Sequence, residues 1–402
     1  MKKTVVIIGS GRSGRGMLGE LYHADGYHLI FADNDQKLVD GLRVQGYYHV
    51  KMSNMASGRV QWALVDDFEI LHTQSDRAAY LEALCRTELI STALLPDAFD
   101  QVIEDLAEMV RLRCARDLPG RVLVTLGANY VGLYERFDTG IRALLDQDAL
   151  AYFQTHVSLV MSIVNRKNLL PGPDEATDDP YLIIGDDKPV LRVEALPELT
   201  QCSSLPGFFR PEHNLEAAMV VKIWTGNLVQ CSMAFVALAH GITGSYEASY
   251  HPLASKYAYY AAAEGYCAVA QKYGLPPRTP EQQKQPVTVF RTKALDDSLF
   301  RIVREPIRKL GKNDRLIGPA LCAARQGIVP YYICRCTAYA FLYKNDADPQ
   351  AVRLQQLVRQ DGIAKTIRSV TGLAPAITEE NLVYSLILNA YRDICGADPL
   401  ES

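Results

Sequence analysis

The chain has 402 residues, of which 48% are hydrophobic and 22% are charged. This composition is typical of a globular protein and excludes a disordered, collagen-like or coiled-coil chain, and the length allows two domains. The net charge of −4, from 42 basic and 46 acidic residues, gives no overall attraction for nucleic acid or an anionic membrane. No uninterrupted apolar run reaches the roughly 18 residues of a membrane-spanning helix.

The nine cysteines are scattered, without a CxxC motif and without a Cys/His pair at zinc-binding spacing. Cys334 and Cys336 form a CxC pair, which we interpret as two buried apolar side chains rather than metal ligands. Lys2 and Lys3 precede an apolar stretch that is far shorter than the core of a secretory signal. We therefore expect a reduced, cytoplasmic protein that binds no metal.

The first part of the chain alternates between strand and helix patterns. Residues 4–8 are a β-branched run typical of a buried parallel strand, and a glycine-rich loop follows at residues 9–14. A helical pattern then runs to Gly26, and residues 27–32 predict a second strand that ends at Asp33. This order is that of a βαβ unit. Further strands are expected at 47–52, 62–71, 89–94, 122–126 and 151–164, and helices at 76–86 and 96–113.

The character of the chain changes after Pro211. The strongest break signals before that point are the residues around 171–174 and Leu205-Pro206-Gly207. Helical periodicity then predicts helices at 215–239, 253–273, 315–324, 331–343, 351–358 and 379–395. We therefore predict the α/β class, with an α/β domain over residues 1–205 and a mainly α-helical domain over residues 206–402.

The loop at residues 9–14 has the GxGxxG spacing of a dinucleotide-binding turn. Gly9 would permit the tight turn, Gly11 the close approach of a pyrophosphate, and Gly14 the packing of the helix on the strand. The N-terminus of the following helix offers N–H groups and partial positive charge to the phosphates. Asp33 would bind the adenosine ribose hydroxyls and repel a 2′-phosphate. These features together predict that the cofactor is NAD rather than NADP.

The predicted helix at 215–239 carries a lysine, Lys222, among apolar residues. On an ideal α-helix, Asn227 lies about 140° and Gln230 about 80° around the axis from Lys222, so the three share one polar arc. A free lysine is only ~0.1% neutral near pH 7.4, so a lysine that acts as a base needs a pKa lowered by about 3. The spacing alone favours a lysine that extends into solvent beside two ordinary polar side chains.

Several segments resemble the mannitol-1-phosphate 5-dehydrogenases of the polyol-specific long-chain dehydrogenase (mannitol dehydrogenase) family. The similarity starts with GSGRSGRGMLGELYHADGYHLIFADND and continues in order through ELISTALLPDAF, VSLVMSIVNRKNLLP, NLEAAMVVKIWTGN and REPIRKLGKNDRLIGPA. It covers nearly the whole chain. The last of these segments is the most specific, and it points to the phosphopolyol branch of the family.

The resemblance implies a Rossmann-type NAD-binding domain followed by a helical substrate domain, with the active site between them and no zinc. It implies that Lys222 is the general base and that Asn227 helps to polarise the reacting oxygen. Arg12 and Ser13 belong to the cofactor loop, and the residues matching segments near the nicotinamide are Thr92, Ala93 and Asn129.

A substrate phosphate would need cationic side chains, which arginine can supply with two parallel hydrogen bonds. The candidates are Arg166, Arg304, Arg308, Lys309 and Arg315. Their alternative role is an ordinary solvated or ion-paired basic surface.

Several positions depart from the family pattern, among them the segment that usually reads CEN and is Gly127-Ala128-Asn129 in this chain. Gln230 stands where the family has a histidine, Met161 where it has an acidic or amide residue, and Asn165 where it has an aspartate. Glutamine can form a hydrogen bond but cannot carry charge or relay a proton near neutral pH. The expected polar surroundings of the base are therefore altered, and the identity of the substrate stays open.

We predict an NAD-dependent oxidoreductase that interconverts a polyol, such as the polyol phosphate mannitol 1-phosphate, and the corresponding ketose. Lys222 would take the hydroxyl proton while Asn227 and Gln230 hold the oxygen. One alternative is an enzyme, such as an epimerase, that retains its NAD and acts on another sugar derivative. The other is a catalytically weak protein that only binds NAD. The expected partner is a small sugar or sugar phosphate, and the oligomeric state is open.

Overall fold

The computed structural model describes residues 2–53, 59–166, 168–171, 178–197, 199, 205–293 and 296–396. The chain divides into two compact units, Met1–Glu216 and Ala217–Ser402. The sequence pattern predicted the division at residue 205. The difference arises because residues 209–212 form a strand that returns to the sheet of the first unit.

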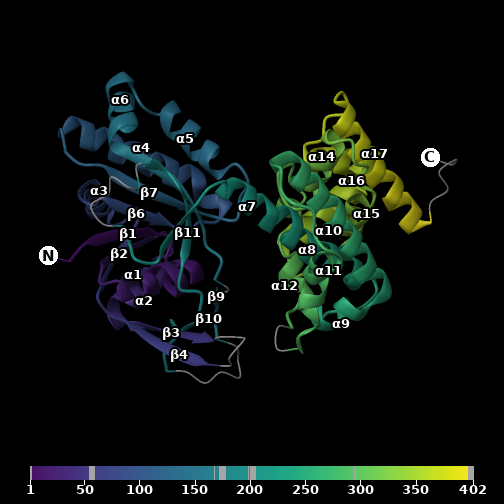
Figure 1. Ribbon diagram of the computed structural model, residues 1–402, viewed down its shortest axis with the longest axis horizontal. Coiled ribbons are helices and arrows are strands. Elements are labelled where there is room, and N and C mark those ends of the chain that lie inside the picture. The colour runs from purple at the N-terminus through teal and green to yellow at the C-terminus, as the bar shows by residue number, and fades with distance from the viewer. Residues whose placement is uncertain are drawn as a thin grey trace. The chain divides into compact units, whose positions relative to one another are not determined.

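The first unit is a sheet with helices on both faces (Figure 1). The large sheet contains β1 (Thr4–Ile8), β2 (His28–Asp33), β5 (Phe68–His72), β6 (Leu89–Thr92), β7 (Val122–Gly127), β8 (Val157–Ile163), β11 (Leu191–Glu194) and β12 (Phe209–Glu212). A smaller sheet contains β3 (Tyr48–Ser53), β4 (Val60–Val65), β9 (Asn168–Leu169) and β10 (Ile183–Asp186). The helices are η1 (Gly14–Gly19), α1 (Glu20–Ala24), α2 (Gln36–Gln45), α3 (Arg77–Arg86), η2 (Pro96–Ala98), α4 (Phe99–Ala115), α5 (Leu133–Ala143) and α6 (Gln147–His156). Helix α7 (Leu215–Val221) begins at the end of the first unit and lies mostly in the second.

The large sheet has the order β12-β11-β8-β7-β6-β1-β2-β5. The six strands from β8 to β5 run parallel, and β11 joins β8 in the antiparallel direction. In chain order the parallel strands are arranged 3-2-1-4-5-6, which is the arrangement of dinucleotide-binding domains. The β-branched and aliphatic residues of β1 are buried because helices cover both faces of this sheet.

Two strand predictions in the first unit are wrong in detail. Residues 151–156 belong to helix α6, because Asp146 caps its N-terminus by accepting the N–H of Ala149 at 2.9 Å, and the strand begins only at Val157. The run at 62–71 is two strands, β4 and β5, which belong to different sheets. The chain break expected around 171–174 lies mostly outside the described residues.

The second unit is mainly helical (Figure 1). Its helices are η4 (Lys222–Asn227), α8 (Leu228–Ala239), α9 (Ser245–Tyr250), α10 (Pro252–Tyr273), α11 (Pro280–Thr288), η5 (Val289–Arg291), α12 (Leu299–Val303), α13 (Pro306–Lys309), α14 (Ile317–Arg325), α15 (Tyr331–Leu342), α16 (Pro349–Thr371) and α17 (Thr378–Cys395). Helix α8 is buried almost all round, and the small residues Ala258, Ala261 and Ala262 of α10 lie in the same core. The predicted class, a Rossmann-type α/β domain followed by a helical domain, is confirmed.

The helix formed by α7, η4 and α8, Leu215–Ala239, is long and apolar enough to cross a membrane by length and composition alone. Its most apolar window has a mean hydropathy of 1.2, and 72% of that window is buried inside the protein. Core helices of globular proteins pass the same test, so this helix is weak evidence for a membrane span.

The cysteines that the structure describes are free thiols, and Cys202 lies outside the described residues. Cys334 and Cys336 are both buried in the core of the second unit. Burial raises the pKa of Cys336 to about 12, so its thiol stays protonated and unreactive near neutral pH.

Candidate functional site

The residues predicted to bind a cofactor follow four neighbouring parallel strands at one edge of the large sheet. The glycine loop follows β1, Asp33 ends β2, Thr92 ends β6, and Asn129 follows β7. The register places Ile8 of β1 opposite both Ala32 and Thr92. In doubly wound sheets, ligands bind at the carboxyl edge where the strand order reverses, which here is between β1 and β6.

The glycine loop meets the steric requirements that the motif predicts. Gly9 has φ +95°, and a Cβ there would lie 2.5 Å from the carbonyl oxygen of Ala93. A Cβ at Gly14 would lie 1.8 Å from the carbonyl oxygen of Gly9. At Gly11, in contrast, a Cβ would meet no atom within 4 Å. The loop is therefore closed around Gly9 and Gly14 and open at Gly11, as the approach of a pyrophosphate requires.

The carboxylate of Asp33 is fastened to the same loop. Its Oδ2 accepts the N–H of Ser10 at 2.6 Å, and its Oδ1 accepts the N–H of Asp35 at 3.0 Å. The Ser10 Oγ is buried and has no hydrogen-bond partner among the described residues. An orphaned hydroxyl and an anchored carboxylate beside an open glycine turn fit a dinucleotide with hydroxyl and phosphate groups.

The helix after the loop opens with Arg12, which is exposed, and Ser13, which is half-buried. Ser13 makes no side-chain capping bond. The first N–H groups of a helix have no intrahelical partner, so this terminus suits an anion.

Arg15 contributes to the loop although the sequence pattern did not single it out. This side chain is 4% exposed, its Nε donates to the Ser10 carbonyl at 2.8 Å, and its Nη1 donates to the Tyr181 carbonyl at 2.7 Å. Burial lowers the pKa of Arg15, and nearby acidic groups oppose that change. The guanidinium ties the glycine loop to a segment far along the chain. The sequence signal that could have identified Arg15 is a charged residue on the face of the predicted helix that is expected to be buried.

The remaining cofactor candidates end the strands β6 and β7. Thr92 Oγ1 accepts the N–H of Gly127 at 2.9 Å, and the Ala93 N–H donates to Ile8 at 2.9 Å. Asn129 is exposed beyond β7. Strands β1, β6 and β7 are thus joined at the edge where these residues lie.

Two of the positions that depart from the family pattern, Met161 and Asn165, lie on and just after β8. Met161 is 6% exposed within the strand. Asn165 follows β8, and its Oδ1 is buried without a hydrogen-bond partner in the described part of the chain.

Arg166 serves the interior of the first unit. Its Nη1 donates to the Gly16 carbonyl and to Glu20 Oε2, both at 2.8 Å, and its Nη2 donates to the Lys188 carbonyl at 2.8 Å. The side chain is 1% exposed. A guanidinium that is enclosed and paired in this way favours a structural role over the substrate contact predicted for Arg166.

The polar residues of the base-bearing helix lie on a π-helical turn, which the α-helical prediction did not anticipate. The turn runs from Lys222 to Asn227, and the Leu228 N–H that closes it donates to the Ile223 carbonyl, five residues earlier. In a π-helix the hydrogen bonds join residues five apart, so two such residues are neighbours on one face, as residues four apart are on an α-helix. Lys222 and Asn227 therefore lie on one face, rather than about 140° apart as on an α-helix.

The α-helix resumes at Leu228 and extends this face. Gln230 and Cys231 come three and four residues after Asn227, so both are its neighbours on the helix surface. Lys222, Asn227 and Gln230 are each half-buried. The structure thus brings the three predicted residues to one side of the helix.

Four predicted cations lie on a segment from Arg304 to Arg315 that includes helix α13. The side chain of Arg304 is 62% exposed and lies 3.4 Å from Glu305. Arg308 donates to Glu305 at 2.8 Å and lies 3.4 Å from Asp314. Burial raises the pKa of Glu305, but Arg308 and the neighbouring cations outweigh it and lower that pKa overall. The cations outnumber the carboxylates, so the segment keeps a positive excess.

The same segment packs against the base-bearing helix at Cys231. Arg315 is largely buried, donates to Asp314 at 2.7 Å, and has the Cys231 thiol as a polar neighbour. Lys309 is 4% exposed, donates to the Arg304 carbonyl, and also lies near Cys231. Burial lowers the pKa of Lys309 to about 8. Two of the predicted cations, Lys309 and Arg315, thus lie beside the helix one turn beyond Asn227.

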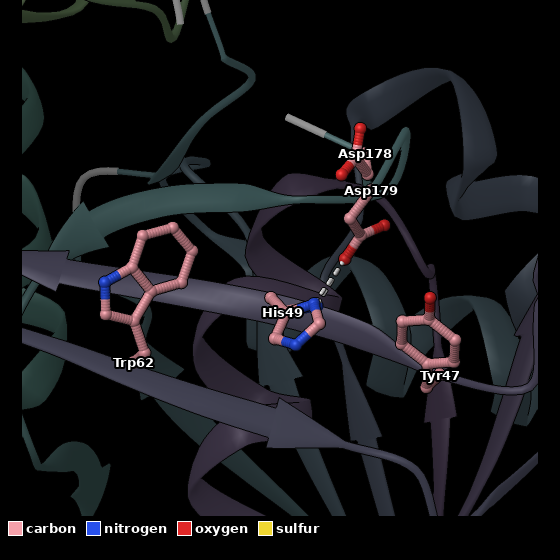
Figure 2. Close-up of a pocket in the computed structure, with 5 residues that line it drawn as sticks. All are labelled: Tyr47, His49, Trp62, Asp178 and Asp179. Carbon is pink, nitrogen blue, oxygen red and sulfur yellow. Dashed lines mark hydrogen bonds and ion pairs between the residues drawn. The ribbon is translucent and has the colours of Figure 1, made fainter. Parts of the chain in front are cut away.

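A separate pocket lies on the outer face of the small sheet, lined by Tyr47, His49, Trp62, Asp178 and Asp179 (Figure 2). Asp179 Oδ2 accepts the His49 N–H at 2.7 Å and lies 3.0 Å from its Nδ1. None of the predicted site residues lines it. Over the described ranges, no group of three or more His, Cys, Asp or Glu side chains is arranged to hold a metal ion, here or elsewhere.

Comparison with known proteins agrees with this geometry. Residues 3–186 match the family model of the mannitol dehydrogenase Rossmann domain. The chain is 24% identical over 392 residues to a mannitol-1-phosphate 5-dehydrogenase of Bacillus licheniformis, covering 95% of this chain and 97% of the relative. It is 26% identical over 379 residues to a mannitol-1-phosphate 5-dehydrogenase of Bacillus pumilus, covering 91% and 95%.

Solved structures share the fold across both units. Pseudomonas fluorescens mannitol 2-dehydrogenase, in a ternary complex with NAD and D-mannitol, superposes with a TM-score of 0.76 at 14% identity, covering 98% of this chain and 92% of that one. A substrate-free D-sorbitol dehydrogenase gives a TM-score of 0.62 at 14% identity, covering 96% and 95%. The family resemblance predicted from the sequence is confirmed.

Proposed function

We propose that this chain, whose residues 3–186 match the model of the mannitol dehydrogenase Rossmann domain, is an NAD-dependent dehydrogenase that interconverts a polyol phosphate and the corresponding ketose phosphate. The match to the mannitol dehydrogenase Rossmann-domain model and the similarity to mannitol-1-phosphate 5-dehydrogenases support the enzyme class, and the geometry of the glycine loop supports the cofactor. The phosphorylated substrate and the lysine base are the finer parts of the proposal.

The cofactor part rests on the edge of the large sheet. The open position at Gly11 and the anchored carboxylate of Asp33 would hold the pyrophosphate and the adenosine ribose. When bound, NAD supplies the acceptor for a hydride from the substrate carbon. A carboxylate at this position disfavours a 2′-phosphate, which supports NAD over NADP.

The chemical part rests on the π-helical turn. Lys222 in its neutral form would take the proton of the substrate hydroxyl, and the Asn227 amide would donate a hydrogen bond to the same oxygen as negative charge develops there. The two groups can serve one oxygen because the π-helical turn places them on one face. Gln230 would add a second amide but no charge.

The observation that carries the proposal of a phosphorylated substrate is the position of the cationic segment. This segment meets the base-bearing helix at Cys231, one turn beyond Asn227. A polyol whose hydroxyl lies at Lys222 would extend its phosphate toward Arg308, Lys309 and Arg315. Hydrogen bonds to charged groups contribute about 1.5–3 kcal/mol each, so such a contact would discriminate strongly against a free polyol.

The test is NADH formation with mannitol 1-phosphate and with mannitol at matched concentrations. We expect a large preference for the phosphorylated substrate. In the variant Arg308→Met, we expect the KM for mannitol 1-phosphate to rise by about tenfold or more, while the KM for mannitol is unchanged. Arg359→Met, which removes an exposed arginine from α16, is the matched control and should change neither constant. Equal activity with both substrates would contradict the phosphate assignment.

Lys222→Met tests the base separately. General-base catalysis contributes about 10²–10⁴-fold, so we expect kcat to fall by that factor while NAD affinity is unchanged. An unchanged kcat would refute the role of Lys222. Interconversion of sugars without net NADH would indicate the NAD-retaining alternative instead.

A further inference from the structure

We propose that Trp224 is a positioning residue that joins the two halves of the substrate site, the base-bearing π-helical turn and the cationic segment. The proposal rests on the function proposed above. It concerns how the site is held together and assigns Trp224 no contact with the substrate.

The indole ring is embedded beside the π-helical turn. Trp224 is third in this turn and is 7% exposed. A Cβ at Gly318 of α14 would lie 2.7 Å from the indole, and a Cβ at Gly265 of α10 would lie 2.7 Å from the Trp224 carbonyl oxygen. Two neighbouring helices therefore have glycine where any larger residue would displace Trp224. This packing holds the turn on both sides.

The side of the turn next to Trp224 has its own support. Thr225 Oγ1 donates to the Val221 carbonyl at 2.6 Å, and Arg278 Nη2 donates to Thr225 Oγ1 at 3.3 Å. π-helical turns are rare and need surroundings that favour them over the continuous α-helix. Packing of Trp224 and the hydrogen bonds of Thr225 are the interactions that supply this preference here.

The indole N–H reaches the cationic segment. Trp224 Nε1 donates to the Asn313 carbonyl at 3.2 Å. The next residue, Asp314, accepts both the backbone N–H of Arg315 at 2.6 Å and its Nε at 2.7 Å. Asp314 also accepts from Arg308 at 3.4 Å. One hydrogen bond from Trp224 thus fixes the turn whose aspartate orients two of the predicted phosphate ligands.

The two parts of the indole are therefore expected to have separable effects. The ring keeps Lys222 and Asn227 on one face, so its loss should lower kcat. The N–H keeps the 311–315 turn in place, so its loss should raise the KM for the phosphorylated substrate. A residue that only stabilised the fold would change both constants in proportion to the loss of stability.

The kinetic test compares Trp224→Phe with Trp224→Leu. Trp224→Phe keeps an aromatic ring, so we expect kcat within about twofold of wild type and a KM for mannitol 1-phosphate about two- to tenfold higher, as for one lost hydrogen bond. Trp224→Leu should lower kcat by a further factor of at least ten. The proposal is overturned if Trp224→Phe lowers kcat and leaves KM unchanged, or if both variants lose activity only in parallel with their melting temperatures.

A second measurement needs no turnover. Trp62 and Trp224 are the two tryptophans of the chain, so Trp62→Phe, which changes an exposed residue of the first unit, leaves Trp224 as the single indole. Inorganic phosphate added to this variant should change the Trp224 emission. Unchanged emission over the range in which phosphate competes with substrate would overturn the proposal. If wild type turns over no polyol phosphate, the proposed function fails, and the phosphate response alone then decides the role of Trp224.

Discussion

Lys309 offers a test in which stability and function should change in opposite directions. This amine is 4% exposed in the second unit, and burial lowers its pKa from 10.5 to about 8. Below pH 8 the folded protein therefore carries a charged group in surroundings that disfavour the charge. We expect Lys309→Met to increase the free energy of unfolding at pH 7 and to weaken binding of the phosphorylated substrate.

The magnitude follows from the pKa difference. Lowering the pKa from 10.5 to about 8 corresponds to about 3 kcal/mol of penalty on the charged form. The variant also loses the hydrogen bond from Lys309 to the Arg304 carbonyl, which contributes about 1 kcal/mol. The expected net gain at pH 7 is therefore about 2 kcal/mol. Natural proteins commonly accept such a cost at functional sites.

The lowered pKa also determines how the stability advantage of Lys309→Met changes with pH. Because the folded pKa lies below the unfolded pKa, the penalty is complete below about pH 8 and disappears as the pH rises toward 10.5. Urea unfolding at several values between pH 7 and pH 10 should show the advantage of the variant shrinking. Lys344→Met removes an exposed lysine of the same unit and should show no such trend. A variant that is less stable at pH 7, or an advantage that does not depend on pH, would refute the reasoning.

Three further outcomes can be checked. Gly14→Ala should lower both the melting temperature and the affinity for NAD, measured by NADH fluorescence titration. Gly11→Ala should lower only the affinity, because its Cβ occupies open space in the protein. Equal melting temperatures of the two variants would contradict this. Arg166→Met should cost about 3–5 kcal/mol in urea unfolding, since it leaves Glu20 as an uncompensated buried carboxylate. Burial raises the pKa of Glu264 to about 7, so wild type should lose stability relative to Glu264→Gln as the pH rises from 4.5 to 7.

The part of the candidate site formed by neighbouring residues could be predicted from the sequence. The strand at 4–8, the glycine loop and Asp33 belong to one βαβ unit, in which the steric need for glycine and the apolar pattern act over short distances. The family resemblance added Lys222 and Asn227. The helical character of the second unit was also evident, because periodicity over long helices is a strong signal.

Residues distant in the chain decided the rest. The enclosure of Arg166, which favours a structural role, comes from partners at the start of the chain, Gly16 and Glu20. The small sheet forms because β10 pairs with β3, more than a hundred residues earlier, and no local pattern encodes that pairing.

The alignment of Lys222 with Asn227 shows most clearly where prediction from the sequence ends. Periodicity predicts a helix over 215–239, and the ordinary α-helical geometry would place Asn227 about 140° around the axis from Lys222. The π-helical turn depends on Trp224, which is packed beside two glycines of other helices and bonded to a third segment. Local hydrogen bonding therefore determined that this segment is a helix, and tertiary packing decided which side chains share its face.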